Sequence, residues 1–120
     1  MNPLESKIIL SCLKGEQLSA VTFIQDYVQL HFDGPFLTAY VWPHILNENG
    51  SVTPKASGYR DTLCELIGKI VVKAFEMPDE RLAIEFANGA VLEVSLRESD
   101  REGPEAAVFR EQAGKGLRVW

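Results

Sequence analysis

The sequence predicts an α+β domain in which two helices lie on one face of a mostly antiparallel sheet of about seven or eight strands. Two segments carry apolar residues at helical spacing and end at a glycine. Other segments alternate apolar and polar residues, as strands with one buried face do. The 120 residues, 46% apolar and 24% charged, can form one core without disulfides or a bound metal to stabilise it. We therefore expect a single domain over residues 1–120.

The first helix is expected over residues 3–14. Asn2 can cap it, Pro3 suits the first helical position, and Glu5 completes a capping-box pattern. Gly15 supplies a left-handed end. The apolar face of this helix contains Leu4, Ile8, Ile9, Cys12 and Leu13.

The second helix is expected over residues 59–67, with Gly68 at its end. Its apolar side contains Tyr59, Leu63, Leu66 and Ile67. The two cysteines, Cys12 and Cys64, lie on the two predicted helices. We expect both to pack as free thiols on the core side, because neither has the neighbouring base that a nucleophilic cysteine needs.

Each glycine is followed by a strand, at residues 18–24 and 70–75, and each strand leads into a hairpin. In the first hairpin, a loop with an even number of residues keeps the apolar side chains on one face. Pro35 has no N–H to donate in a tight turn at 33–34. A four-residue loop at 33–36 is therefore expected.

The register of the second hairpin depends on the length of its turn. A two-residue turn would place the apolar residues of the two strands on different faces. A three-residue loop at 87–89 instead pairs Ile84 with Leu92 and Leu82 with Val94, which keeps one apolar face. We predict the three-residue loop.

The order of helix, strand and hairpin occurs twice and predicts a duplicated αβββ unit. The pseudo-repeats span about residues 2–46 and 57–97, and further strands follow within 104–120. Residues 47–57 are rich in turn formers and are expected to be a mobile loop. Six identities align the units: Leu10, Leu13, Gly15, Phe32, Gly34 and Leu37 match Leu63, Leu66, Gly68, Phe86, Gly89 and Leu92.

No motif in the sequence identifies a reaction. His31 and His44 are the two histidines, and no His or Cys cluster has the spacing of metal ligands. The segment at 114–116 lacks the spacing of a phosphate-binding loop, and there is no nucleophile elbow. We therefore predict no cofactor, no metal and no catalytic residue.

Acidic residues gather in two connections between strands of the second unit, at 79–80 and 98–105. Successive strands of a meander run in opposite directions, so both connections should lie at the same end of the sheet. A negative patch there would steer a basic partner. The predicted partner-binding residues are Asp79, Glu80, Glu98, Asp100 and Glu102.

Three aromatic residues, Phe36, Tyr40 and Trp42, share one parity on a predicted strand and should face away from the helices. They form either a second core under the C-terminal strands or a surface for a partner. Coverage by the C-terminal strands is favoured, because Phe109 and Trp120 also need burial.

The composition also bears on location and partners. The N-terminal segment lacks the features of a signal peptide, and no apolar run approaches the about 18 residues of a membrane span. The net charge of −5 disfavours nucleic-acid binding, and two cysteines indicate reduced thiols. These observations predict a cytoplasmic protein that binds neither nucleic acid nor a membrane.

Several segments resemble those of an uncharacterised family of small bacterial proteins with a duplicated helix–Gly–strand–hairpin unit and a C-terminal Val-Trp. The resemblance spans most of residues 9–120. It implies a cytoplasmic protein without catalysis, similar to the immunity proteins that neutralise bacterial toxins. The matching segments are Leu66-Ile67-Gly68-Lys69-Ile70-Val71, residues 82–86, Asn88-Gly89, residues 92–94, residues 104–107 and Leu117-Arg118-Val119-Trp120.

The sequence thus favours a non-enzymatic, immunity-like binding protein that holds a basic protein partner, such as a toxin domain, through its acidic loops. The alternative is a small-molecule-binding protein or an unrecognised enzyme with a pocket between helices and sheet. A third alternative is an oligomerisation module, for example a homodimer that pairs through edge strands.

Overall fold

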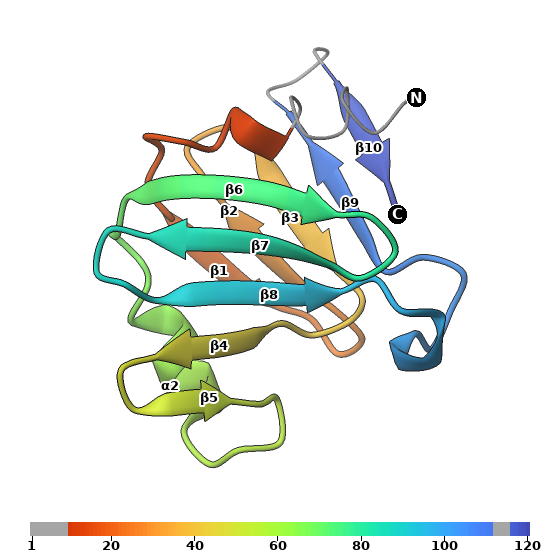
Figure 1. Ribbon diagram of the computed structural model, residues 1–120, viewed down its shortest axis with the longest axis horizontal. Helices are drawn as coiled ribbons and strands as arrows, with labels where there is room; N and C mark the ends of the chain where they lie inside the picture. Colours follow the sequence, from red (N-terminus) through yellow and green to blue (C-terminus); the bar gives the residue numbers. More distant parts are fainter. Residues whose placement is uncertain (1–9, 112–115) are drawn as a thin grey trace.

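The computed structural model describes residues 10–111 and 116–120, and two antiparallel sheets of five strands each make up most of it. Figure 1 shows the second sheet in front, with its strands running across the view, and the first sheet behind it. In spatial order, the first sheet consists of β1 (Ala20–Phe23), β2 (Val28–His31), β3 (Phe36–Ala39), β9 (Ala107–Arg110) and β10 (Leu117–Val119). The second sheet consists of β5 (Gly50–Val52), β4 (His44–Asn47), β8 (Val91–Ser95), β7 (Arg81–Phe86) and β6 (Val71–Met77).

The predicted α+β fold, with two helices on one face of a single sheet, is wrong. The described residues contain the six-residue helix α2 (Tyr59–Cys64) and the short 3₁₀ helix η1 (Glu98–Asp100). A helical turn is also present at residues 10–11. The greater part of the first predicted helix, residues 2–9, lies outside the described residues. The second predicted helix is present but ends at Cys64, three residues earlier than expected.

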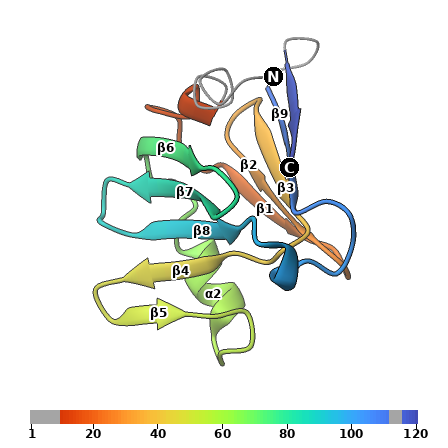
Figure 2. The same cartoon turned by 45° about the vertical axis from the view of Figure 1, so that its right-hand side comes forward.

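The two sheets cover each other, and this removes the need for a helical lid. Figure 2 shows them as two layers, with α2 beside β4 and β5. Leu30 and Phe32 of the first sheet's hairpin and Ile84 and Phe86 of the second lie in one core cluster, each at most 2% exposed. Strand alternation indicates that one face of a strand is buried, but a helix and a second sheet satisfy it equally well.

Residues 15–18, which follow the helical turn at residues 10–11, pair reciprocally with residues 68–71, which follow α2. The Gly15 N–H donates to the Val71 carbonyl at 2.8 Å, and the Gly68 N–H donates to the Leu18 carbonyl at 2.7 Å. Both glycines have φ near +90°, a left-handed conformation that other residues adopt only at a cost. Two further bonds repeat the pattern: Val71 N–H to Glu16 O at 2.8 Å and Leu18 N–H to Lys69 O at 3.1 Å.

Each half of the chain forms a three-stranded meander and then sends a hairpin to the opposite sheet. After β3, the hairpin β4–β5 joins the second sheet beside β8. After β8, the hairpin β9–β10 joins the first sheet beside β3. The strand order of the two sheets therefore matches, β1-β2-β3-β9-β10 against β6-β7-β8-β4-β5. The evolutionary duplication of an αβββ unit stays a prediction.

The exchanged hairpins change the expected role of residues 47–57. The sequence predicts a mobile loop there, but residues 50–52 form strand β5. Asn47 pairs with Gly50, and the Asn47 side-chain oxygen accepts a hydrogen bond from the Asn49 N–H at 2.9 Å. The turn formers in this segment therefore build a hairpin turn rather than only a linker.

The predicted register of the second hairpin is confirmed. Ile84 pairs with Leu92, and Leu82 pairs with Val94. The Phe86 N–H donates to the Ala90 carbonyl at 2.9 Å across the three-residue loop.

The predicted loop of the first hairpin is wrong by two residues. His31 pairs with Phe36, and the Phe32 N–H donates to the Pro35 carbonyl at 2.8 Å. The turn is therefore the tight one at Asp33 and Gly34, both with positive φ. Phe32 and Pro35 could exchange two backbone hydrogen bonds. Proline is tolerated because its carbonyl still accepts the bond from Phe32, and only the bond that its missing N–H would donate is lost.

Truncation of a core side chain should show how much stability the contact between the sheets provides. Replacing Phe86 with alanine removes a ring that is 2% exposed, and we expect a loss of about 3–5 kcal/mol in the free energy of unfolding. Phe36→Ala, at a half-buried position of the same residue type, is the matched control and should cost much less. Equal losses in chemical denaturation would contradict the assigned core.

The left-handed glycine at the junction can be tested separately. A Cβ added at Gly68 would have no atom within 4 Å, so the cost of Gly68→Ala comes from its φ of +90° alone. We expect a loss of about 1–2 kcal/mol. Gly103 also has open space but no left-handed φ, so Gly103→Ala should leave the thermal midpoint unchanged or raise it slightly. Equal thermal midpoints of Gly68→Ala and Gly103→Ala would show that the left-handed backbone at position 68 has no such cost.

Candidate functional site

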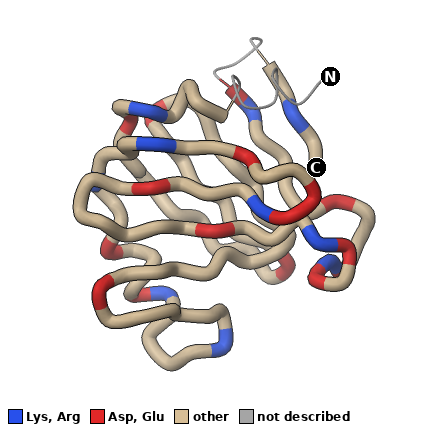
Figure 3. The backbone as a smooth tube through the Cα atoms, in the orientation of Figure 1, with Lys and Arg blue, Asp and Glu red and all other residues tan. Residues whose placement is uncertain are grey.

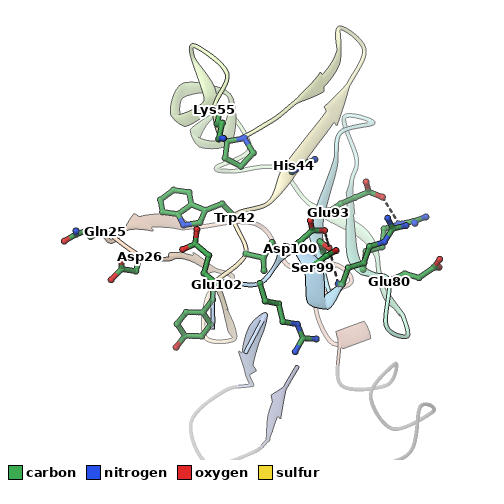
Figure 4. A pocket seen from close by; sticks show the side chains of 17 residues that line it. Gln25, Asp26, Trp42, His44, Lys55, Glu80, Glu93, Ser99, Asp100 and Glu102 are labelled. Atoms are coloured by element: carbon green, nitrogen blue, oxygen red, sulfur yellow. Dashed lines mark hydrogen bonds and ion pairs between the residues drawn. The ribbon is translucent and has the colours of Figure 1, made fainter. Parts of the chain in front are cut away.

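A cleft of about 870 Å³ is lined by residues from both sheets and their connections. We call it the main cleft. The β1–β2 turn contributes Gln25 and Asp26, and the connection between β3 and β4 contributes Tyr40 and Trp42. The opposite side comes from β7, β8 and the segment around η1 (Figure 4).

The two predicted acidic connections meet at this cleft. The Leu96 N–H, just after β8, donates to the Glu80 carbonyl in the β6–β7 turn at 2.9 Å, so both connections lie at the same end of the second sheet, as expected. Figure 3 shows acidic segments gathered there, with basic ones between them. Of the five predicted partner-binding residues, Glu80, Asp100 and Glu102 line the main cleft. Asp79 and Glu98 belong to the same two segments but do not line it.

The carboxylates of the cleft differ in what they contact. Asp100 accepts a hydrogen bond from the Ser95 hydroxyl at 2.5 Å, and Glu93 forms an ion pair with Arg81 at 2.8 Å. Glu102 and Glu80 are exposed and form no ion pair or side-chain hydrogen bond with another described residue.

A further carboxylate, Asp26, was missed by the sequence reasoning. It is exposed, lines the main cleft and has no side-chain partner among the described residues. Asp26 lies far from 79–102 in the sequence, and only the packing of the two sheets brings it near Glu102. In the sequence, Asp26 is a single acidic residue in an ordinary hairpin turn, and such a residue does not by itself predict a binding site.

The basic residues of the cleft are partly engaged in holding the backbone. Arg101 donates to the carbonyls of Leu96 at 2.8 Å and Pro104 at 3.2 Å, which fixes the path of the segment around η1. Lys55 and Arg97 also line the cleft and form no ion pair with a described residue. Their positive charges reduce the acidity of the cleft without neutralising it.

Trp42 is fixed in place by two aromatic neighbours. Its ring centroid lies 6.2 Å from that of Phe23 and 6.4 Å from that of Tyr59. The Tyr59 hydroxyl donates to the Pro43 carbonyl at 2.7 Å, and burial raises the pKa of Tyr59 above its ordinary value. Trp42 therefore presents a rigid ring to the cleft.

The predicted coverage of Phe36, Tyr40 and Trp42 by the C-terminal strands is wrong, because β9 pairs edge to edge with β3 in the same sheet and does not lie over it. Phe109 is fully buried, but Tyr40 is 38% exposed at the cleft, where its ring lies 5.4 Å from that of Tyr27. The reason is that β3 ends at Ala39, so strand parity does not extend to Tyr40 and Trp42. Instead, Ala106 holds this connection by accepting hydrogen bonds from the N–H groups of residues 40 and 41.

A second hollow of about 550 Å³ adjoins the main cleft. Gln25, Trp42 and Pro54 line both hollows. The second hollow adds residues at and before the start of α2, including Ala56 and Asp61. We call it the side hollow.

The two histidines do not form a metal site. His31 lies 5.5 Å from the Phe36 ring and 3.4 Å from the Thr22 hydroxyl, measured at Nε2. His44 is exposed in the main cleft, opposite Glu93 on the neighbouring strand. Within residues 10–111 and 116–120, no group of three or more His, Cys, Asp or Glu residues is placed to hold a metal ion. No helix in that part of the chain is long and apolar enough to cross a membrane.

The predicted packing of Cys12 and Cys64 on the core side is wrong, because both are exposed. Partial burial of the Cys12 thiol nevertheless raises its pKa to about 11, and the negative charge of Glu111, a hydrogen bond to that carboxylate and the charge of Glu16 add to the effect. The thiol form is therefore favoured, which makes Cys12 a poor nucleophile.

Alkylation kinetics should reveal this raised pKa. A rise from 9.0 to about 11 lowers the thiolate fraction at pH 8 roughly a hundredfold, and the greater nucleophilicity of the more basic thiolate restores part of the rate. In a Cys64→Ser background, iodoacetamide should react with Cys12 about tenfold more slowly than with an unstructured cysteine peptide. Glu111→Gln should raise the rate. A native rate equal to that of the peptide would contradict the assigned environment.

Comparison of the chain with family models, curated proteins and solved structures finds no match. The resemblance to a family of small, immunity-like bacterial proteins therefore stays a prediction. The site is defined by its own geometry alone.

Proposed function

We propose that this chain is a protein-binding domain whose main cleft receives a basic side chain of a protein partner. One observation carries the proposal: the free carboxylates of Asp26 and Glu102 line the same cleft as the fixed ring of Trp42, and Glu102 lies next to that ring (Figure 4). On the sequence resemblance, the partner is a basic toxin domain and the protein acts in the cytoplasm as its immunity protein.

The chemistry of the cleft fits a guanidinium or ammonium group. Carboxylates attract such a group by charge, and the aromatic faces of Trp42 and Tyr40 attract it by cation–π interaction, worth about 0.5–2 kcal/mol. Because the neighbours of Trp42 already fix its ring, little conformational entropy is lost on binding. The acidic turns at the rim would also steer a basic partner during its approach.

A small ligand is the alternative, because a volume of about 870 Å³ lies within the range of small-molecule sites. The lining favours a protein partner. The unpaired carboxylates of Asp26, Glu80 and Glu102 are exposed on turns at the rim, where they can reach a partner surface. Small-molecule sites are mainly apolar and enclose most of their ligand.

Charge reversal should separate the two candidates. A double variant, Asp26→Lys with Glu102→Lys, and a matched control, Glu48→Lys, serve with the wild type as baits in a pull-down from native cells. Glu48 is exposed in the β4–β5 turn and does not line the main cleft. A true partner is basic, and the wild type and the control capture it but the double variant does not.

The partner identified in this way is then tested by association kinetics at low ionic strength. We expect the double variant to associate at least about tenfold more slowly and Glu48→Lys to change the rate little. Equal thermal midpoints of all three proteins exclude unfolding as the cause. Unchanged kinetics of the double variant would overturn the proposed function.

A further inference from the structure

Resting on this proposed function, we infer that the bound part of the partner is an extended chain segment that passes over Trp42. It places a basic side chain in the main cleft and an apolar side chain in the side hollow. The site would thus recognise a short pattern of residues rather than positive charge alone.

The first support is the continuity of the two hollows. Volumes of about 870 and 550 Å³ share three lining residues, Gln25, Trp42 and Pro54. Trp42 and Pro54 are half-buried, so the boundary that the two hollows share presents exposed apolar surface. A single side chain fills a small part of either hollow, whereas a chain segment that crosses this boundary uses both.

The second support is the difference between the two linings. The unpaired carboxylates of Asp26 and Glu102 belong to the main cleft and not to the side hollow. In the side hollow, the guanidinium of Arg60 lies over the Phe23 ring at 5.2 Å, which leaves its charge paired with an aromatic face. Trp42, Pro54 and Ala56 give the hollow apolar surface, and its two charged lining residues, Arg60 and Asp61, carry opposite charges, so the hollow has no net charge to attract a second basic side chain.

The third support is the exposed amide of Gln25, which lines both hollows. It forms no hydrogen bond with another described residue. A carboxamide carries both donors and an acceptor, and these match the C=O and N–H of a peptide group. Because Gln25 lines both hollows, its exposed amide is available to the main chain of a segment that passes between them.

Capped peptides test the inference through the fluorescence of Trp42. Trp120 is the other tryptophan, so the measurement uses Trp120→Phe. Alternate residues of an extended chain point to the same side, so the probe is the capped tripeptide Arg-Ser-Leu. Two relatives complete the set: Arg-Ser-Ser, which lacks the apolar side chain, and citrulline-Ser-Leu, which lacks the charge.

We expect Arg-Ser-Leu to bind about tenfold more tightly than Arg-Ser-Ser, because leucine is buried in the side hollow. Ala56→Gln places a polar side chain over the apolar surface of that hollow without a change of charge, so it should reduce this difference and leave Arg-Ser-Ser unaffected. Gln25→Ala should weaken both arginine peptides.

The outcomes distinguish this inference from the proposed function. If both arginine peptides bind equally, or Ala56→Gln leaves the leucine preference intact, the inference is wrong and the proposed function stands. If the citrulline peptide binds as well as Arg-Ser-Leu, or no arginine peptide binds, the proposed function fails and the inference fails with it.

Discussion

The mutual burial of the two sheets is the interaction on which the rest of this structure depends. Each sheet has one apolar face, and the largest buried rings, Phe32, Phe86 and Phe109, come from both sheets. Within the described residues, the one α-helix with complete bounds is short and adds Tyr59 and Leu63 to this core, so the sheets there cover each other more than a helix does. The loops that line the main cleft come from both sheets, so their relative positions depend on this contact.

The main cleft exists because each half of the chain sends a hairpin to the opposite sheet. The connection after β3 and the connection after β8 both pass from one sheet to the other, and Ala106 joins them by hydrogen bonds. The first connection carries Tyr40 and Trp42, and the second carries Asp100 and Glu102. Aromatic and acidic side chains from distant parts of the sequence therefore meet because each half completes the other's sheet.

Local patterns predicted what depends on neighbouring residues and failed where partners are distant. The three-residue loop that ends at Gly89 and the meeting of the acidic connections followed from strand parity and chain direction. The predicted pair of helices over one sheet was wrong, because alternation of apolar and polar residues shows that a strand has a buried face but not whether a helix or a second sheet covers it. The predicted four-residue loop at 33–36 was wrong, because the missing N–H of Pro35 removes only one hydrogen bond at the end of the hairpin and its carbonyl still accepts the other. Asp26 joined the site through tertiary packing, which leaves no local signal, whereas Trp42 belongs to the aromatic set for which a partner surface was one of two predicted roles.

The crossed hairpins also determine how the chain must fold. The hairpin β4–β5 cannot join the second sheet until β8 exists, and β9 must return to β3, which lies early in the sequence. Neither half carries a closed core, so the first half emerging from the ribosome has no stable resting state of its own. Late, long-range contacts of this kind make folding slow and cooperative. The same topology makes the C-terminal hairpin the natural element for two copies to trade at high concentration.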